Sequence, residues 1–275
     1  MIILEARALT FAYPGRENVL REIDFTVEEG AFLALLGANG CGKTTLFQHF
    51  NGLLKPSAGT VLLRGKSLNE WGNEEIFRRV GLVFQDPNDQ LFAATVYDDV
   101  SYGPTNLRLG PVKITLRVQQ ALKNVGMWEY RKRSLHELSY GQKKRVAIAG
   151  ILAMQPEIMI LDEPTAGLDP RTAAALMKLL KSLQKEQGLT IILATHDVDI
   201  VPIFCDRVYV MQNGAIIREG TPSQVFADPE KIRQAFLRLP RVAHLIELLK
   251  RDGVLNIDNL PLTIGEAKHC LEDLR

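Results

Sequence analysis

The sequence is poor in cysteine, and its three cysteines follow no spacing pattern. Cys41, Cys205 and Cys270 lie far apart, without a C-x-x-C pair. We therefore expect neither a disulfide framework nor a zinc site, and a reducing compartment is favoured. The sequence also has no surplus of one charge, since 33 basic and 32 acidic side chains leave a formal net charge of +1. That balance gives no overall electrostatic reason to expect a nucleic-acid partner.

Long hydrophobic runs are missing as well. The apolar runs, such as 158–161 and 191–194, have the length of strands, whereas a membrane span needs roughly 20 residues. The first residues, Met-Ile-Ile-Leu-Glu, lack the basic start and long apolar core of a signal peptide. With 275 residues, of which 46% are hydrophobic and 24% charged, we expect a cytoplasmic globular protein with one large domain and an appendage, or two small domains.

The most informative stretch that is present covers residues 37–45, G-A-N-G-C-G-K-T-T. An apolar run precedes it and a helical pattern follows, which is the context of a phosphate-binding loop. Its glycines allow a tight turn with inward N–H groups, and the new helix adds unpaired N–H groups and the positive end of its dipole. The residues expected to bind phosphates are Gly37, Asn39, Gly40, Cys41, Gly42, Lys43, Thr44 and Thr45.

Two acids follow the apolar run 158–161. A continuous apolar run belongs to a central strand, and open α/β sheets bind ligands at the carboxyl ends of their strands. We expect Asp162 to hold Mg²⁺, directly or through water, together with the Thr44 hydroxyl. Strand alternation would turn Glu163 to the opposite side, where it could activate a water for attack on a γ-phosphate. Two solvated acids at a strand end are the alternative, which the upstream phosphate loop disfavours.

A capping box is predicted where Ser139 precedes Gln142 by three residues. Such a helix start presents a hydroxyl and N–H groups to an anion, although a plain helix cap explains S-x-x-Q by itself. The basic runs 131–133 and 143–145 are expected to be solvated helix faces. Four of the five histidines are expected to be surface or packing residues: His49, His136, His244 and His269.

Along the chain, residues 2–30 and 60–64 read as strands, and 87–155 as a mostly helical insertion. A helix over 171–186 should end at Gly188, and Asn213–Gly214 predicts a hairpin turn. We therefore expect residues 1–86 and 156–220 to form a nucleotide-binding core with an N-terminal β subdomain. Residues 87–155 would form a helical subdomain, and 221–275 a small C-terminal helical extension.

As a set, these motifs occur in the order and approximate spacing of an ABC-type ATPase subunit, which the chain resembles over roughly residues 1–220. The resemblance implies an α/β fold of the P-loop NTPase class, with a mostly parallel sheet and an antiparallel β subdomain. It also implies roles for further residues. Tyr13 would stack on adenine, Gln85 would sense Mg²⁺ and the attacking water, and His196 would contact the γ-phosphate. Ser139, Gly141 and Gln142 would clamp the γ-phosphate of ATP held by another subunit, and residues 167–169 would cross the dimer interface.

One position departs from the family pattern. The commonest family signature has glycine where this chain has Tyr140, which we expect to adopt ordinary helical dihedrals just inside a helix start. That tyrosine, followed by 143–150, resembles the ATPase of energy-coupling-factor importers, in particular the cobalt/nickel type. Segments 84–92 and 96–103 carry the same resemblance.

The resemblance implies an ATPase that uses ATP and Mg²⁺ to power an importer, most simply for cobalt or nickel in connection with cobalamin synthesis. Its catalytic residues would be Glu163, His196 and Gln85, and its Mg²⁺ ligands Thr44, Gln85 and Asp162. It would pair head to tail with a second copy or a close paralogue. It would dock peripherally, at the cytoplasmic face of the membrane, on a transmembrane coupling subunit beside a substrate-binding membrane subunit.

Three alternatives stay open at this point: an ATPase for a vitamin importer, a soluble ABC ATPase acting on DNA or ribosomes, and a nucleotide-binding regulator without turnover. The single cassette and the balanced charge disfavour the second, and the presence of Glu163 and His196 disfavours the third. The cargo, the membrane subunits and the role of the C-terminal extension do not follow from the sequence.

Overall fold

The larger of two sheets carries the centre of the fold. The computed structural model describes residues 1–15, 17–257 and 259–272, and within them this sheet has the strand order β10-β9-β3-β8-β7-β6. Neighbouring strands are parallel except β9 and β10. The strands are β3 (Phe32–Leu36), β6 (Val80–Val83), β7 (Ile158–Asp162), β8 (Thr190–Thr195), β9 (Arg207–Gln212) and β10 (Ala215–Gly220).

Local sequence explains two features of this sheet. β3, β7 and β8 are buried along their whole length, as the continuous apolar run within each strand predicts for strands covered on both faces. The turn between β9 and β10 has φ of 48° at Asn213 and 79° at Gly214. Positive φ at both central residues is what a type I′ hairpin turn requires, so the predicted hairpin is confirmed.

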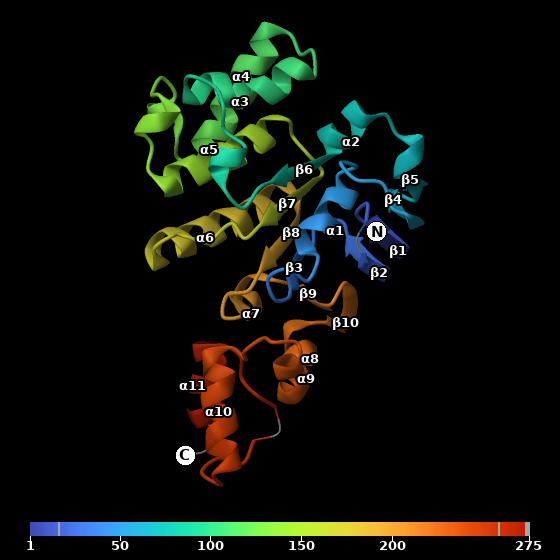
Figure 1. Cartoon of the computed structure of the whole chain (residues 1–275). Coiled ribbons are helices and arrows are strands. Elements are labelled where there is room, and N and C mark those ends of the chain that lie inside the picture. The colour runs from blue at the N-terminus through green and yellow to red at the C-terminus, as the bar shows by residue number, and fades with distance from the viewer. Residues whose placement is uncertain (16, 258, 273–275) are drawn as a thin grey trace.

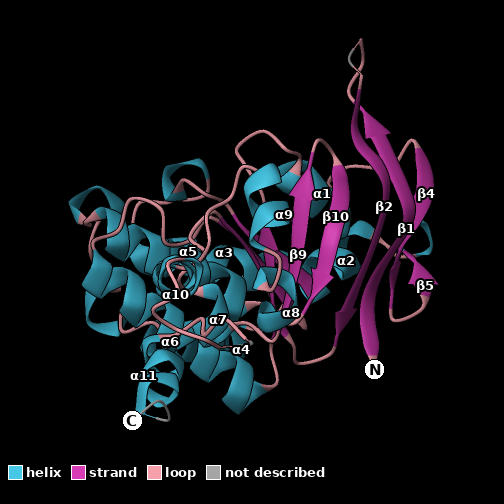
Figure 2. Cartoon of the chain, turned by 90° about the horizontal axis from the view of Figure 1, so that it is seen from below, coloured by secondary structure: helices cyan, strands magenta, loops and turns pink. Residues whose placement is uncertain are grey.

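The smaller sheet is antiparallel, in the order β2-β1-β4-β5, and lies beside the larger one (Figure 2). The Tyr209 hydroxyl of β9 joins the two sheets, because it accepts a hydrogen bond from the Thr26 N–H (3.2 Å) and donates one to the Thr26 carbonyl (3.1 Å). Helix α1 (Lys43–Phe50) packs Phe47 and Phe50 into the core shared by both sheets. The strands are β1 (Ile2–Ala12), β2 (Asn18–Glu28), β4 (Ala58–Leu63) and β5 (Lys66–Ser67).

The chain between β6 and β7 forms a helical lobe, at the top of Figure 1. Val100, Val118, Leu122 and Val146 bring its three helices together in a common apolar core. These helices are α3 (Val96–Asn106), α4 (Pro111–Asn124) and α5 (Tyr140–Ala153), and α2 (Asn73–Arg79) precedes β6. Four short 3-10 turns also lie in the described residues between β5 and α5: η1 (Leu68–Glu70), η2 (Pro87–Asp89), η3 (Trp128–Tyr130) and η4 (Leu135–Glu137).

The C-terminal extension lies at the opposite end of the molecule from the lobe (Figure 1). Leu237 and Leu239 join the same core cluster as Val198, and the Arg238 guanidinium donates a hydrogen bond to Asp199 (2.7 Å). The extension is therefore packed and ion-paired against the segment that follows β8. The remaining helices are α6 (Pro170–Gln187), α7 (Val201–Phe204), α8 (Pro222–Phe226), α9 (Pro229–Gln234), α10 (Arg241–Arg251) and α11 (Ile264–Glu272).

The predicted fold class is confirmed, whereas the division into three residue ranges stays a prediction. Helix α6 ends at Gly188, which adopts the expected left-handed conformation (φ 66°). One prediction is wrong: the basic run 143–145 is not a solvated helix face, because Lys144 is only 3% exposed. No helix in the described parts of the chain is long and apolar enough to cross a bilayer.

Candidate functional site

An open cleft of about 410 Å³ lies at the carboxyl ends of β3 and β7. It brings together the phosphate loop, the two acids at the end of β7, and Gln85 shortly after β6, which are far apart in sequence. Its lining is Tyr13, Val19, Asn39, Gly40, Gly42, Lys43, Thr44, Thr45, Gln85, Asp162 and Glu163. Of these, only Val19 was not among the predicted site residues, since a valine early in a strand carries no signal for a ligand.

The loop 37–42 takes its shape from glycines that act in two ways. Gly40 and Gly42 have φ of 79° and 111°, which a side chain disfavours. Gly37 has no positive φ, but a Cβ there would lie 2.6 Å from both Cys41 Sγ and the Met211 carbonyl oxygen. Gly37 and Cys41 therefore pack behind the loop, outside the described lining of the cleft, and burial raises the pKa of the Cys41 thiol.

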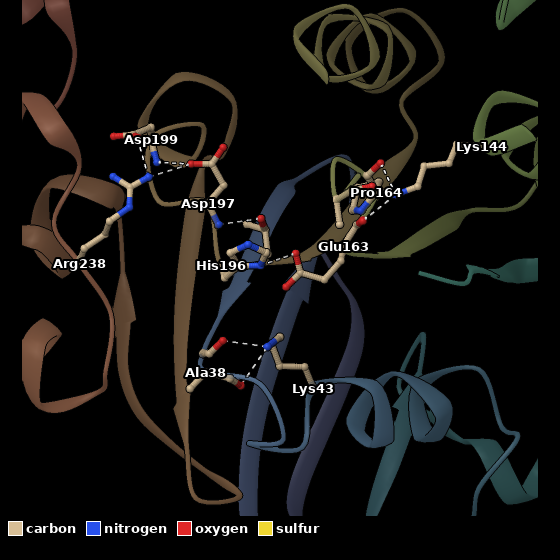
Figure 3. Close-up of polar contacts among 12 residues, drawn as sticks. Ala38, Lys43, Lys144, Glu163, Pro164, His196, Asp197, Asp199 and Arg238 are labelled. Carbon is tan, nitrogen blue, oxygen red and sulfur yellow. Dashed lines mark hydrogen bonds and ion pairs between the residues drawn. The ribbon is translucent and has the colours of Figure 1, made fainter. Parts of the chain in front are cut away.

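The Lys43 side chain folds back over this loop (Figure 3). Its Nζ donates hydrogen bonds to the carbonyl oxygens of Gly37 (2.8 Å) and Ala38 (3.2 Å), and the side chain is 7% exposed. An ammonium group has three protons, so two bonds leave one for an oxyanion in the cleft. Lys43 is thus held at the loop and remains able to bind phosphate.

Thr44 and Asp162 meet at the floor of the cleft. The Thr44 hydroxyl donates a hydrogen bond of 2.5 Å to the Asp162 carboxylate. Burial raises the pKa of Asp162, while the Thr44 hydrogen bond and the Lys43 charge act in the other direction. Gln85 follows β6 and lines the same cleft. The three residues predicted to bind a magnesium ion are therefore brought together, and all three offer oxygen ligands, the type Mg²⁺ prefers.

Glu163 corrects the sequence-based expectation. It was predicted to face away from Asp162, but both side chains line the cleft, because a left-handed conformation at Glu163 (φ 46°) interrupts the strand alternation. Its Oε2 atom lies 2.9 Å from Nδ1 of the exposed His196 (Figure 3). Apart from this contact, the carboxylate oxygens have no hydrogen-bond partner among the described residues, although the residue is only 4% exposed. A buried carboxylate with free acceptor sites can bind a water molecule.

The predicted capping box is present at the start of α5. The Ser139 hydroxyl accepts a hydrogen bond from the Gln142 N–H (3.3 Å), and the Gln142 side chain accepts one from the Ser139 N–H (3.0 Å). Tyr140 lies in the helix without positive φ, as expected. None of Ser139, Gly141 and Gln142 belongs to the lining of the cleft, as far as the described residues define it. The start of α5 and the cleft are therefore separate places on one chain.

At the other end of the cleft, the Tyr13 hydroxyl lies 3.3 Å from Thr45 Oγ1, which links the aromatic residue to the first turn of α1. The Phe11 and Tyr13 rings pack edge to face, with their centroids 4.9 Å apart. Tyr13 is thus placed beside the phosphate loop, as an adenine-stacking side chain would be.

Comparison with known proteins agrees with this geometry. The model of the family described as ABC transporter matches residues 20–166. The energy-coupling factor transporter ATP-binding protein EcfA of Methanocaldococcus jannaschii is 54% identical over 274 residues, which cover 98% of this chain and 96% of that protein. EcfA of Methanococcus maripaludis is 51% identical over 276 residues, 99% of this chain and 98% of that one.

Solved structures give the same answer. The structure of cbiO1 from Clostridium perfringens, described as part of the ABC transporter complex cbiONQ, is 50% identical with a TM-score of 0.78, and covers 90% of this chain and 99% of that one. A dimeric ATP-binding cassette in a post-hydrolysis state, bound to ADP and Pi, is 28% identical with a TM-score of 0.72, covering 80% and 99%. The chain therefore belongs to the ABC transporter ATP-binding proteins, among the energy-coupling-factor ATPases, and it is an ATP-binding and ATP-hydrolysing enzyme.

Proposed function

We propose that this chain powers an energy-coupling-factor importer for cobalt or nickel, connected with cobalamin synthesis, and that it hydrolyses ATP in the cleft below Lys43. The observation that carries the proposal is the convergence of the phosphate loop, Asp162 and Glu163 in that cleft, with His196 in contact with the Glu163 carboxylate. The cargo rests on the resemblance of Tyr140 and segments 84–92 and 96–103 to the cobalt/nickel type. A vitamin importer is the alternative within the same class.

In this proposal the loop binds the phosphates of ATP and Tyr13 stacks on the adenine. The free proton of Lys43 and the N–H groups at the start of α1 offset the negative charge of the triphosphate. Thr44, Asp162 and Gln85 would hold Mg²⁺, which when bound neutralises charge on the transferred phosphoryl group. The positions of Thr44 and Asp162 support a shared role in binding Mg²⁺, because Thr44 Oγ1 and Asp162 Oδ2 are 2.5 Å apart.

Glu163 is the proposed general base. Apart from the His196 contact of Oε2, its carboxylate oxygens have no hydrogen-bond partner within the described chain, so they can orient a water and take its proton during attack on the γ-phosphate. His196 lies beside this carboxylate and projects from the end of β8. It can hold the γ-phosphate from the side opposite the loop.

The second half-site is proposed to act on a partner's ATP. Ser139 accepts a hydrogen bond from the Gln142 N–H and keeps its own hydroxyl proton, which can be donated to a phosphate oxygen. Because these residues lie outside the cleft of their own chain, two copies, or this chain and a close paralogue, would pair head to tail. ATP can favour the closed pair only through contacts made in that state. The dimeric form of a solved relative supports this arrangement.

A membrane partner is supported by an apolar groove between β6 and the helical lobe. The groove has a volume of about 350 Å³. Phe92 is 66% exposed and meets the Tyr102 ring edge to face at 4.7 Å. The apolar residues that line the groove are Phe77, Leu82, Phe84, Phe92, Tyr102, Leu107, Ile151 and Met154. Exposed apolar patches of this kind mark interaction sites, and we assign this one to a transmembrane coupling subunit.

The groove is connected to the cleft through one side chain. Gln90 accepts a hydrogen bond from the Phe84 N–H (3.1 Å) and donates one to the Ala147 carbonyl (3.2 Å). It therefore joins the segment before Gln85 to α5, so a partner seated in the groove would act on both half-sites. The chain would then lie peripherally at the cytoplasmic face of the membrane, near a substrate-binding membrane subunit.

The test is co-purification of the tagged full chain from membranes, followed by uptake assays with cobalt and nickel. Phe92→Asp should release the chain from its membrane partner and abolish uptake, while Leu116→Asp, an exposed position on α4 outside the groove, should leave both unchanged. Uptake of a vitamin without metal would favour the vitamin importer. Recovery of ribosomes or DNA in place of membrane subunits would contradict the proposal.

A further inference from the structure

Lys144 is a buried cation that none of the roles above uses. It lies in the first part of α5 and is 3% exposed. Its Nζ donates hydrogen bonds to three backbone carbonyl oxygens, those of Glu163 (3.0 Å), Pro164 (2.9 Å) and Ala166 (2.7 Å) (Figure 3). The three protons of the ammonium group are thus matched by three acceptors.

Filling space does not explain a lysine at this position. Burial lowers the pKa of Lys144 to about 8, because the ammonium group loses hydration, and the charges of Glu163 and Asp86 offset only part of that effect. A buried charge is unfavourable unless it is hydrogen-bonded, and an apolar side chain of similar length would avoid the penalty. What lysine adds is the set of three donors.

The three acceptors belong to the turn that follows β7. Glu163 has φ of 46°, a conformation that a side chain disfavours and that persists only where the surroundings fix it. Within the turn, the Ala166 N–H donates a hydrogen bond to the Glu163 carbonyl (3.1 Å). Lys144 binds that same carbonyl oxygen and two more beyond it. Its ammonium group therefore holds three carbonyl groups of the turn 163–166 together.

Tyr140 extends this contact along the same helix face. It lies four residues before Lys144, so the two side chains are neighbours on α5, and its ring centroid is 5.3 Å from Lys144 Nζ. A Cβ on Gly167 would lie only 3.0 Å from Tyr140 Cε1. The backbone of Gly167 therefore packs directly against the ring. The first turns of α5 and the segment 163–167 form one contiguous unit.

We propose that Lys144 is a positioning residue for ATP hydrolysis, which holds the turn 163–166 so that the Glu163 carboxylate points into the cleft. This inference rests on the proposed role of Glu163. Because Ser139 begins the same helix, Lys144 also fixes the distance between the two half-sites of one chain. A displacement of α5 displaces Glu163 with it, and misplacing a reacting group by about 1 Å can reduce the rate on the order of 100-fold.

The test compares Lys144→Met with the unaltered full chain. Methionine fills a similar volume without donors, so we expect kcat, measured by phosphate release, to fall about 100-fold. The affinity for ATP, measured with a fluorescent ATP analogue, should change less than about twofold, because the phosphate loop is untouched. Lys178→Met is the matched control, since Lys178 is exposed on α6, and it should leave both quantities unchanged.

A second variant covers the case in which Lys144→Met does not fold. Lys144→Gln keeps two donors and should reduce kcat by about 10-fold at unchanged ATP affinity. Either variant, folded and with normal kcat, would overturn the proposal. So would a parallel loss of kcat and ATP affinity, or the failure of both variants to fold, because each would make the lysine a structural residue. No turnover by the unaltered chain would instead contradict the proposed function.

Discussion

Two helices of this chain begin at motifs that we predict to bind phosphate, and their first turns are built in opposite ways. Helix α1 starts after Gly42 in a left-handed conformation, and no side chain among the described residues caps it. Helix α5 starts after Ser139, whose hydroxyl and backbone N–H both exchange hydrogen bonds with Gln142. The start of α1 lies in the cleft, whereas Ser139 at the start of α5 is exposed outside the cleft.

We expect this difference to divide the residues that set the affinity for ATP from those that set the rate of its hydrolysis. The first-turn N–H groups of α1 have no competing side chain, so they can bind phosphate within one chain. At the start of α5 the capping box already pairs the N–H groups of Ser139 and Gln142, so fewer first-turn N–H groups, those of Tyr140 and Gly141, remain beside the Ser139 hydroxyl proton. We therefore expect the α1 side to set the affinity for ATP, and the α5 side to set turnover once two copies close. The first three predictions below test this division and the fourth concerns stability at the floor of the cleft, in order from the largest expected effect to the smallest.

The largest effect is expected for Glu163→Gln, which keeps the shape of the side chain but cannot accept a proton. Turnover should fall by about 100- to 1000-fold, the range for loss of a transition-state contact, while ATP binding survives because the α1 side is intact. Phosphate release and nucleotide binding measure the two quantities separately. Near-normal hydrolysis would assign the base elsewhere.

Lys43→Ala should instead reduce affinity. The variant loses a charge-assisted hydrogen bond to the phosphates, so the dissociation constant for ATP should rise by about 100-fold in titration calorimetry. Lys178→Ala, at an exposed position of α6, is the control and should bind ATP normally. Unchanged affinity in the Lys43 variant would contradict the phosphate-loop interpretation.

Ser139→Ala tests the α5 side. We expect kcat to fall about 10-fold through loss of one hydrogen bond to phosphate, with ATP affinity unchanged. Removing the cap alone also costs about 1 kcal/mol of stability. Thr221→Ala removes the same type of capping box from α8, far from the cleft, so it should lower the melting temperature without lowering kcat. Equal kcat losses in both variants would make Ser139 a plain cap.

The smallest effect concerns stability at the floor of the cleft. Burial raises the pKa of Asp162 above its value in the unfolded chain. The buried carboxylate therefore lowers the free energy of unfolding at high pH. This loss of stability is absent below the unfolded pKa and grows as pH rises through the folded pKa. Asp162→Asn stays neutral and still accepts the Thr44 hydrogen bond. Its melting temperature should rise by a few degrees at neutral pH and converge with the unaltered chain on acidification. An equal shift at both pH values would contradict this reading.

Features encoded by a few adjacent residues could be predicted from the sequence. The loop at Gly42 and Lys43, the capping box at Ser139 and the helix end at Gly188 each depend on local backbone chemistry. The strand order could not be predicted, because β3 lies between β8 and β9, more than a hundred residues away in the chain. Such pairing is decided by packing of the whole sheet.

The two errors have the same physical origin. Strand alternation predicted that the side chains of Glu163 and Asp162 face opposite sides. The left-handed conformation of Glu163 turns its side chain to the same side, and Lys144 of α5 binds the Glu163 carbonyl in that conformation. Charge placed Lys144 on a solvated face, although it lies in line with the buried Ile148 and Leu152 at four-residue spacing. That spacing was the available signal. Each residue was misjudged because its partner is distant in sequence.

The bond between Tyr209 and Thr26 has a consequence for how the molecule can move. A fully buried hydroxyl there is bound to both backbone groups of a residue in the other sheet. Sliding one sheet against the other would break both bonds at once, without water to replace them. The two sheets are therefore joined at this point, and a movement of one sheet carries the other with it.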